Sequence, residues 1–492
     1  MKEQIPFIDL RQSESRAPLY RQIYEAVRLA ILRGEFASKT RLPSTRELAR
    51  NLGVSRITVV NAYEQLLAEG YLIGKIGAGT FVAPALPDDL LQTGAEKGER
   101  SAAGTNPPAP LSPFGRKLLS GDVQSARVHA GTQFRPFQNG LTAIDLFPFE
   151  IWWRIAAKYH KNPPRSILGY GDPRGFYPLR QAVAAHLGSA RGVNCSAEQV
   201  VITSGAQQAL DLTARIFLTE NDAVLVEDPC YREACGSFAA TGARIVPVEV
   251  DEEGLNPAKI PGAGARAKLV YATPSHQYPL GATMNLARRL ALLDWAEQNN
   301  AWIIEDDYNS EYRYAGRPLA SLQGLDKAGR VIYVGTFSKT IFPGLRIGCA
   351  VVPPELVDVY GGARALGDVH SAAFDQAVLA EFIAEGHFAR HVRRMRLLYE
   401  HRQRALVAAC EKHLKGRLEV KKAAAGMHLV GWLPEGVDDR RVADKAAEKG
   451  IKVSPVSSYS LKKKRRGGLV LGYTAFDERQ IEEGVRRLSE AL

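Results

Sequence analysis

The chain has 492 residues, of which 45% are hydrophobic and 24% are charged, and its formal net charge is +11. This length exceeds what one hydrophobic core supports, so two or three domains are expected, and the positive charge favours anionic partners. No apolar run approaches the roughly 20 residues that span a bilayer, and the N-terminus lacks the apolar segment of a signal peptide. The five cysteines lack the spacing of metal ligands. We therefore expect a cytoplasmic protein with no membrane partner and no metal site.

The first 83 residues have the pattern of a winged helix-turn-helix domain. Apolar residues within 18–33 recur at the spacing of one helical face. Ser44-Thr-Arg-Glu47 is a capping box that would open a second helix, and Ser55 would cap a third helix over 56–69. Glycines and alternating apolar residues over 71–82 predict a two-stranded wing. The side chains expected to face inward are Leu19, Ile23, Ala26, Val27, Ala30 and Ile31, then Leu48, Ala49 and Leu52, then Val60, Tyr63 and Leu67.

The third helix of this domain is the predicted reader of the DNA major groove. Arg56 and Thr58 lie at its N-terminal end, where side chains reach base edges, while Arg46 and the wing residue Gly79 are expected to meet phosphates. An ordinary three-helix packing domain is the competing interpretation, and the glycine-rich wing argues against it. The residues predicted to bind double-stranded operator DNA are Ser44, Arg46, Ser55, Arg56, Thr58, Asn61 and Gly79.

The rest of the chain divides into a linker and two further parts. Residues 84–130 are rich in proline and poor in large apolar side chains, which predicts an extended linker. In 131–390, short apolar runs alternate with helical patterns such as 285–298, which indicates an α/β domain whose mostly parallel sheet is covered on both faces. Residues 391–492 are expected to form a smaller α+β domain. The predicted strands are 199–203, 223–226, 244–248, 269–271, 301–304, 331–334 and 347–352.

Several polar residues follow predicted strand ends, where ligands bind in parallel sheets. Lys339 can condense with an aldehyde cofactor, and Arg346, seven residues later, can hold that cofactor's phosphate through its bidentate fork. Asp306 is the candidate to keep a pyridine nitrogen protonated. Tyr308 is the candidate to bond the oxygen on the same ring.

A strand-to-helix turn at 203–210 would present backbone N–H groups to the phosphate. Gly205, Ala206 and Gln207 are assigned to this turn, and Thr336 completes it together with Arg346. Tyr231 follows the next strand and would stack on the pyridine ring, although a core aromatic is the alternative interpretation. The combined pattern resembles the pyridoxal 5'-phosphate (PLP) site of fold-type I aminotransferases.

Outside the linker, the whole chain resembles the MocR family of bacterial regulators, a branch of the GntR superfamily in which a winged helix is fused to an aminotransferase-like domain. The resemblance implies a homodimer, PLP held on Lys339, and DNA binding controlled by PLP or by its adduct with an amino compound. It also implies that Tyr170 reaches the cofactor phosphate of the partner subunit. The motifs that carry the resemblance are Leu42-Pro-Ser-Thr-Arg-Glu-Leu48, Val54-Ser-Arg-Ile-Thr58, Gly77-Ala-Gly-Thr80, Tyr170-Gly-Asp-Pro-Arg-Gly175, Thr273-Pro-Ser-His-Gln-Tyr-Pro279, Glu305-Asp-Asp-Tyr308 and the Lys339 stretch.

Two positions depart from working aminotransferases. Tyr278 stands where those enzymes have an asparagine that bonds the ring oxygen, and His276 either substitutes for it or is structural. Val470 stands where they have an arginine that binds the substrate carboxylate, and a buried carboxylate without a partner is costly. Arg232, beside Tyr231, is an alternative cationic partner for an effector acid. We therefore expect sensing of a small-molecule effector and assign no catalytic residue.

Two other functions compete with a PLP-responsive transcriptional regulator. One is a catalytically active PLP-dependent aminotransferase with an accessory DNA-binding domain, and the other is a scaffold in which both domains are vestigial. The complete sets of polar residues in both domains argue against the scaffold. DNA binding with weak or absent turnover would separate the regulator from the aminotransferase.

Overall fold

The structure, a computed structural model, describes residues 17–75, 78–86, 111–120, 134–262, 266–316, 319–462 and 466–492. Contacts divide the chain into two compact units, Met1–Ala109 and Pro110–Leu492. Among the described residues, no helix is both long and apolar enough to cross a bilayer.

The first unit contains the three helices and the wing that the sequence predicts. Its elements are α1 (Leu19–Leu32), α2 (Thr45–Leu52), α3 (Arg56–Ala68), β1 (Leu72–Lys75) and β2 (Gly79–Val82). The Ser44 and Ser55 side chains cap α2 and α3, because their oxygens accept from the backbone N–H groups of Glu47 at 3.2 Å and Thr58 at 3.3 Å. β1 and β2 pair antiparallel. The unit therefore has the winged helix-turn-helix fold.

The inward faces of α1 and α3 differ from the sequence prediction. Leu19, the first residue of α1, is 48% exposed, and Leu67 in α3 is 37% exposed. Val60 is only half-buried. Val59-Val60 and Leu66-Leu67 make two neighbouring faces of α3 equally apolar, so packing against α1 selects between them. The buried side chains of α3 are Val59, Ala62, Tyr63 and Leu66.

The second unit is built on an eight-stranded sheet that contains all seven predicted strands. The strands are β3 (Val200–Thr203), β4 (Ala223–Asp228), β5 (Arg244–Asp251), β6 (Gly254–Leu255), β7 (Leu269–Ala272), β8 (Trp302–Asp307), β9 (Val331–Thr336) and β10 (Gly348–Val351). Their order is β3-β10-β9-β8-β7-β4-β5-β6. The five strands from β9 to β5 in this order run parallel, and β10 pairs antiparallel with both β3 and β9. The sheet is thus mostly parallel, as predicted.

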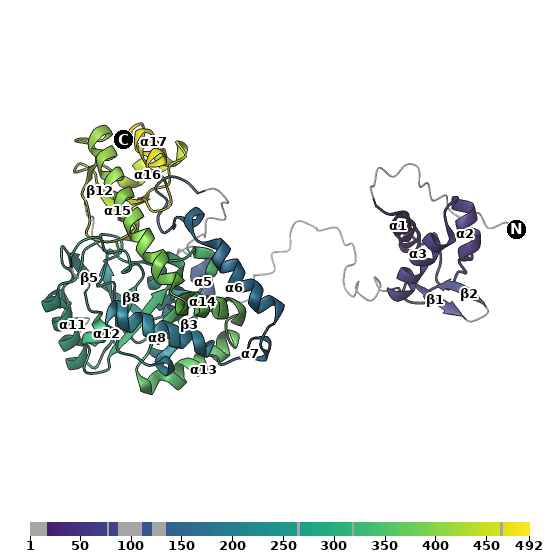
Figure 1. The fold of residues 1–492 in the computed structure, drawn as a ribbon, viewed down its shortest axis with the longest axis horizontal. Coiled ribbons are helices and arrows are strands. Elements are labelled where there is room, and N and C mark those ends of the chain that lie inside the picture. The colour runs from purple at the N-terminus through teal and green to yellow at the C-terminus, as the bar shows by residue number, and fades with distance from the viewer. Residues whose placement is uncertain are drawn as a thin grey trace. The chain divides into compact units, whose positions relative to one another are not determined.

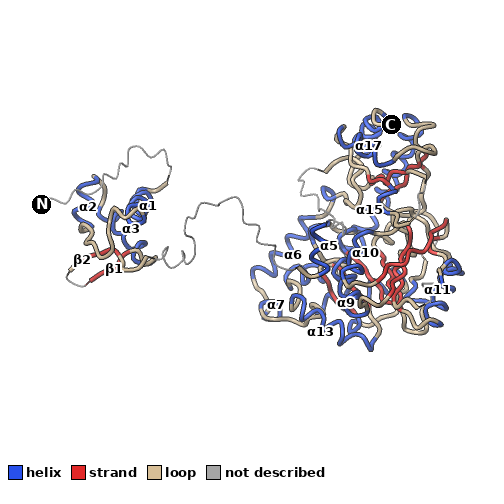
Figure 2. The backbone as a smooth tube through the Cα atoms, turned by 180° about the vertical axis from the view of Figure 1, so that it is seen from behind, coloured by secondary structure: helices blue, strands red, loops and turns tan. Residues whose placement is uncertain are grey.

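Helices cover both faces of this sheet, and Figure 2 shows its strands enclosed by them. The helices that precede the C-terminal part of this unit are α5 (Pro113–Ser120), α6 (Phe149–Lys161), α7 (Arg165–Leu168), α8 (Tyr177–Arg191), α9 (Ala206–Phe217), α10 (Arg232–Ala240), α11 (Leu286–Gln298), α12 (Leu322–Leu325), α13 (Val357–Asp368) and α14 (Ala373–Ala384). One face packs on α9, α10 and α13. The other packs on α6, α8 and α14 and, further along, on α11 and α12. Strands buried on both faces explain the unbroken apolar runs in the sequence.

Helix α5 lies inside the predicted linker, 84–130. A helix there was not expected from the proline content of this segment. Residues 87–110 and 121–130 of the predicted linker lie outside the described residues, as do residues 131–133.

The C-terminal part of the second unit packs on a separate four-stranded antiparallel sheet, and α15 (His387–His413) leads into it (Figure 1). Its other elements are β11 (Glu419–Val420), β12 (His428–Trp432), α16 (Asp439–Glu448), β13 (Ser454–Pro455), β14 (Gly468–Gly472) and α17 (Glu478–Ser489). Phe137, which precedes the large sheet, is 1% exposed in this core and bridges Gly472. This bridge ties the segment 137–141 to the C-terminal part.

Candidate functional site

Strand β8 ends in three acidic residues, Glu305, Asp306 and Asp307, and none is more than 5% exposed. Successive side chains of a strand point to opposite faces of its sheet. Glu305 and Asp307 therefore share one face, and Asp306 lies on the other. Burying a carboxylate is costly unless partners compensate it, so the partners on each face show what each residue does.

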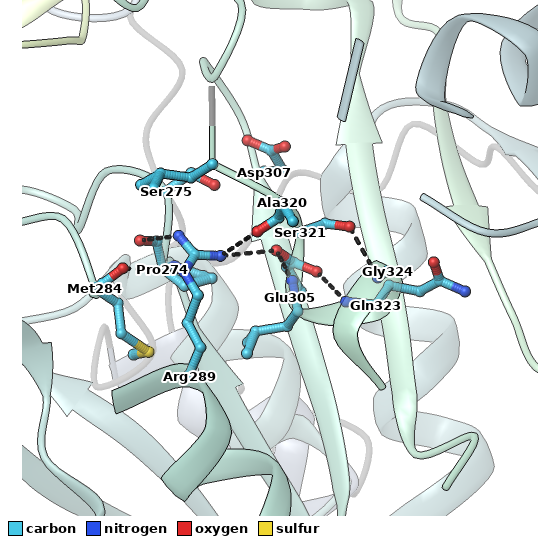
Figure 3. Close-up of polar contacts among 12 residues, drawn as sticks. Pro274, Ser275, Met284, Arg289, Glu305, Asp307, Ala320, Ser321, Gln323 and Gly324 are labelled. Atoms are coloured by element: carbon cyan, nitrogen blue, oxygen red, sulfur yellow. Dashed lines mark hydrogen bonds and ion pairs between the residues drawn. The ribbon is translucent and has the colours of Figure 1, made fainter. Parts of the chain in front are cut away.

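Glu305 is held by a buried structural network. Its carboxylate accepts hydrogen bonds from the backbone N–H groups of Leu322 and Gln323, both at 2.9 Å. Arg289, which is 1% exposed, places its Nη1 3.9 Å from Glu305 (Figure 3). The guanidinium of Arg289 also donates to the carbonyls of Pro274, Met284 and Ala320.

Asp307 forms an ion pair with a second buried arginine, Arg191. Its Oδ2 lies 2.7 Å from Nε of Arg191 and accepts hydrogen bonds from the hydroxyls of Ser310 and Tyr333, both at 2.8 Å. Arg191 in turn donates to the hydroxyl of Ser275 at 2.7 Å. Glu305 and Asp307 are therefore each compensated by a buried arginine, and of their carboxylate oxygens Oδ1 of Asp307 has no hydrogen-bond partner among the described residues.

Asp306 lacks such a partner. Its Oδ2 accepts a hydrogen bond from the hydroxyl of Tyr271 at 2.7 Å, while its buried Oδ1 has no partner among the described residues. Burial raises the pKa of Asp306 to about 7, and the charge of Lys339 and the bond from Tyr271 only partly offset this. An unpaired buried carboxylate oxygen is suited to a protonated ring nitrogen.

Lys339 lies in a short 3₁₀ turn, Phe337–Lys339, directly after β9. Its Nζ donates to the carbonyl of Gly140 at 3.1 Å. Burial and the charge of Arg346 lower the pKa of Lys339, which favours the neutral, nucleophilic amine. Gly140 has φ +81°, and a Cβ there would lie 2.7 Å from Nζ. A glycine at 140 thus leaves room for the lysine.

The N-terminus of α9 forms an anion cradle with Arg346. Gly205, with φ +89°, precedes α9, and no side chain caps this helix. Arg346 is exposed and donates to the carbonyl of Ser204 at 2.9 Å. A Cβ at Gly205 would lie 2.8 Å from Nη2 of Arg346. Free backbone N–H groups and a neighbouring guanidinium are the elements of a phosphate site.

Two further residues predicted for the cradle have other side-chain contacts. The Gln207 side chain donates to the carbonyl of Glu233 and the hydroxyl of Ser237. Only the backbone N–H of Gln207 is therefore left to bind a phosphate. The Thr336 hydroxyl accepts from the backbone N–H of Ser338 at 3.2 Å. Ala206 is the first residue of α9 and contributes its backbone N–H alone.

Four tyrosines form an aromatic cluster beside these groups: Tyr231, Tyr278, Tyr308 and Tyr459. The Tyr278 ring meets the other three edge to face, with centroids 5.8, 5.7 and 5.3 Å away. Its hydroxyl accepts a hydrogen bond from Asn139 at 3.0 Å and lies 3.1 Å from the hydroxyl of Tyr459. Tyr278, which the sequence predicts at the asparagine position of aminotransferases, thus joins 137–141 to the C-terminal part.

His276 and Tyr308 make a buried pair within this cluster. The His276 Nδ1 lies 2.8 Å from the hydroxyl of Tyr308. Burial and the neighbouring His428 lower the pKa of His276 to about 3, so its ring is neutral at physiological pH. A Cβ at Gly426 would lie 2.4 Å from Nε2, which shows how tightly the ring is packed. His276 therefore orients Tyr308. This placement fits both interpretations from the sequence, a substitute for the aminotransferase asparagine and a structural histidine.

Val470 lies on the face of the C-terminal sheet that looks toward the aromatic cluster. Leu469 and Leu471 point into the core of that part, so Val470 points the other way. It pairs with Val430, whose face also carries His428, and the His428 ring lies 5.6 Å from Tyr278. Val470, which the sequence predicts at the carboxylate-binding position, therefore shares its sheet face with His428.

Tyr170 differs from the other predicted cofactor residues in its exposure. Its side chain is 93% exposed, and its ring contacts His370 at a centroid distance of 6.2 Å. By contrast, the sequence missed Asn139 and Tyr459, which lie far from Lys339 along the chain and carry no strand-end signal.

The predicted DNA surface divides into capping residues and exposed ones. The hydroxyls of Ser55 and Thr58 lie 2.6 Å apart, so both serve the start of α3, as Ser44 serves α2. Arg46, Arg56 and Asn61 are exposed, and Gly79 has φ +109° beside the Arg41 side chain. Ile57, which the sequence prediction omitted, is 63% exposed at the start of α3. An apolar side chain there is suited to a thymine methyl group.

The arrangement in the second unit fits PLP. A nucleophilic lysine, an unpaired carboxylate and an anion cradle are the three partners that its aldehyde, ring nitrogen and phosphate require. The fit rests on Oδ1 of Asp306, which has no other described partner, and on Gly205, whose missing side chain leaves the cradle open.

Comparison with known proteins assigns a family to each unit. Residues 145–488 match the family described as aminotransferase class I and II, and residues 19–82 match the bacterial regulatory proteins of the gntR family. The chain is 39% identical to the probable rhizopine catabolism regulatory protein MocR of Rhizobium meliloti, over 97% of this chain and 94% of that protein. The chain belongs to the MocR family of transcriptional regulators.

Enzymes also resemble part of this MocR-family chain. Aromatic-amino-acid aminotransferase 1 of Thermococcus litoralis is 32% identical over 72% of the chain and 86% of the enzyme. The crystal structure of Pyrococcus horikoshii kynurenine aminotransferase, in complex with PMP, superimposes with a TM-score of 0.68 at 31% identity, covering 79% of this chain and 96% of that one. The aminotransferase fold predicted from the sequence is thereby confirmed.

Replacement by asparagine should change the stability of the protein in opposite directions at Asp306 and at Asp307. Because folding raises the pKa of Asp306 from 3.8 to about 7, the free energy of unfolding falls as the pH rises through that range. Asp306→Asn should therefore stabilise the cofactor-free protein, on the order of 4 kcal/mol at pH 8 and less at pH 5. Thermal unfolding at both pH values measures this.

Asp307→Asn is the matched control on the adjacent residue. It weakens the buried pair with Arg191 and should lower the unfolding temperature at both pH values. Destabilisation of the cofactor-free protein by Asp306→Asn at pH 8 would contradict a carboxylate held for a ligand.

Proposed function

We propose that this protein is a PLP-dependent DNA-binding transcriptional regulator whose aminotransferase-like domain senses PLP or a PLP–amino compound adduct. The proposal rests above all on Asp306, a buried carboxylate with a free oxygen beside Lys339, in a chain that also carries a winged helix. A cofactor site that holds a costly unpaired charge, joined to a DNA-binding fold, is suited to coupling ligand occupancy to DNA affinity.

Each site residue has one task in this proposal. Lys339 provides the amine that holds the cofactor, Asp306 keeps the ring nitrogen protonated, and Tyr231 stacks on the ring. Gly205, Ala206 and Gln207 offer backbone N–H groups to the phosphate, with Arg346 and Thr336 beside them. Tyr308, oriented by His276, bonds the ring oxygen. When bound, PLP supplies an electron sink for an attached amine.

The DNA-binding part of the proposal assigns the first unit, residues 1–83, to operator recognition. Helix α3 would enter the major groove with Arg56, Ile57 and Asn61 toward the base edges. Arg46 and the wing at Gly79 would meet phosphates. Residues 84–130 would serve as the linker to an aminotransferase-like part, 131–390, and a small C-terminal part, 391–492.

The proposal also includes a homodimer. Tyr170 is 93% exposed, as expected of a residue that completes the site of the partner subunit. A regulator of this kind must reach the chromosome, which places its action in the bacterial cytoplasm.

Lys339→Ala tests the cofactor site. The wild-type protein incubated with PLP should be yellow, and borohydride should fix the cofactor to the peptide that contains Lys339, as mass spectrometry would detect. The variant should lose both signals because no other described lysine occupies the site. Lys268→Ala removes an exposed lysine of the same unit and should change neither signal. Persistent labelling of the Lys339→Ala protein would refute the assignment.

Arg56→Ala tests base recognition by α3. On the operator, found by footprinting beside the gene itself with and without PLP, binding should weaken by roughly 1–3 kcal/mol, because a bidentate base contact is lost. Random duplex DNA should be affected less, and all binding should weaken steeply with salt. Arg33→Ala removes an exposed charge outside the predicted surface and serves as the control. Equal losses on operator and random DNA would show that Arg56 only contacts the backbone.

A working aminotransferase is the second candidate, because Lys339 and Asp306 are both in place. A screen of α- and ω-amino acids with 2-oxoglutarate or pyruvate as acceptor separates the two. With Val470 at the carboxylate position, we expect spectral changes and altered DNA affinity with negligible product. Multiple turnover near the median enzyme rate of about 10 per second would favour the enzyme.

A further inference from the structure

The first half of α15, the long helix that leads into the C-terminal part, carries exposed arginines that have no task in the proposed function (Figure 1). Residues 387–399 contain no acidic residue, and all four of their arginines are exposed: Arg390, Arg393, Arg394 and Arg396. Arg390, Arg393 and Arg394 are spaced by three and four residues, so their side chains lie on one side of the helix. We call these three residues the arginine stripe. The buried side chains of this half are Phe388, His391, Val392 and Met395.

The arginine stripe forms no ion pair with a carboxylate among the described residues. Arg390 and Arg394 each donate to a backbone carbonyl, those of Glu385 and Leu146. The Glu385 carboxylate contacts the histidine at the first position of α15 instead, at 2.9 Å. Arg393 makes neither a hydrogen bond nor an ion pair with any residue that the structure describes. Three guanidinium charges are thus held side by side without an acidic partner there.

The second half of the same helix is compensated. Arg404, which lies on the same side of α15 as the arginine stripe, forms an ion pair with Glu400 at 2.6 Å. Lys412 lies 2.8 Å from a carboxylate oxygen of Glu482. The lack of acidic partners is therefore confined to the first half of α15, and it is not a general property of this surface.

The arginine stripe is unfavourable for the helix that carries it. Like charges three and four residues apart on a helix repel each other. Arg390 also lies near the N-terminus of α15, where the helix dipole disfavours a cation, and the first turn holds no acidic residue. A local arrangement that costs stability without a compensating contact in the protein indicates a function. Three adjacent guanidinium groups are suited to a polyanion.

The polyanion that fits best is duplex DNA. The chain carries a winged helix of the gntR family, so a duplex bound there is tethered to α15 by the chain itself, and even a weak second contact becomes populated. The stripe spans about 6 Å of helix axis, and phosphates follow each other every ~3.4 Å along one DNA strand. More than half of the net positive charge lies outside residues 1–85. An acidic protein is the competing partner, because Leu397 on the same side of α15 is 67% exposed.

We propose that the arginine stripe binds the phosphate backbone of the duplex that the winged helix holds, beyond the base pairs that the winged helix reads. This inference rests on the DNA-binding part of the proposed function and requires no role of PLP. Phosphates are the same in every sequence, so this contact adds affinity without adding specificity. Each phosphate that an arginine neutralises releases counter-ions, and the contact is therefore measurable as salt dependence.

Operator duplexes of two lengths test the proposal on the full-length protein. The short duplex contains only the base pairs whose substitution weakens binding, and the long one adds roughly two helical turns of random sequence on each side. Affinity is measured by fluorescence anisotropy from about 50 to 200 mM salt, where phosphate contacts have a large effect. The slope of log affinity against log salt should be steeper for the long duplex in the wild-type protein.

Two variants assign this extra slope to the arginine stripe. Replacing Arg390, Arg393 and Arg394 together by glutamine should lower the slope on the long duplex by roughly 2 to 3 and leave binding of the short duplex unchanged. Arg393→Gln alone should lower it by about 1, because one phosphate contact is lost. The Arg393→Gln protein should unfold at the wild-type temperature or above it, since a repulsion is relieved.

A control variant removes the same number of positive charges from exposed, ion-paired positions. Its substitutions are Arg215→Gln, Lys259→Gln and Arg486→Gln, whose partners are Asp211, Glu249 and Glu483. It should keep the wild-type slope on both duplexes. An equal fall of the slope in this control would report net charge alone and overturn the inference.

The remaining outcomes separate the inference from the proposed function. An unchanged slope on the long duplex in the folded triple variant overturns the DNA contact and leaves an acidic protein as the partner of α15. A lower unfolding temperature of the Arg393→Gln protein assigns this residue a structural role and also overturns it. Failure of the wild-type protein to bind the operator at all would instead refute the DNA-binding part of the proposed function.

Discussion

The site depends on how the three buried carboxyl groups at the end of β8 are compensated. Alternation along the strand sends Glu305 and Asp307 to one face, where the buried guanidinium groups of Arg289 and Arg191 compensate them. Asp306 points the other way and keeps a free oxygen. Because the outer two carboxylates are compensated by packed arginines, only the middle one lies on the opposite face without an arginine partner.

Other residues of the site are also held in unfavourable backbone conformations or carry ionisable groups that are buried. Gly205 and Gly140 adopt left-handed φ values where a Cβ would collide with Arg346 and Lys339. The lysine is desolvated, which lowers its pKa, and the aspartate is desolvated, which raises its own. The two shifts have the same cause, because burial penalises the charged form of each group. Such sites trade stability for binding.

The cofactor residues come from both parts of the second unit. Lys339 and Asp306 belong to the large sheet, whereas Tyr459 and Val470 belong to the C-terminal part, and Asn139 joins the two through Tyr278. A ligand held by Lys339 and Asp306 would therefore lie beside residues of both parts. In a regulator this matters, because any ligand that changes DNA affinity must itself be bound differently by the DNA complex.

Sequence patterns by themselves determined the winged helix, the seven strands, and the placement of Lys339, Asp306 and Arg346, because apolar periodicity and strand-end positions are local signals. Tertiary structure decided which face of α3 is buried, since Val59-Val60 and Leu66-Leu67 offer two equivalent faces. It also brought Asn139, Tyr278 and Tyr459 into contact. Their proximity follows from the packing of segments far apart in the chain, and no local pattern encodes such contacts.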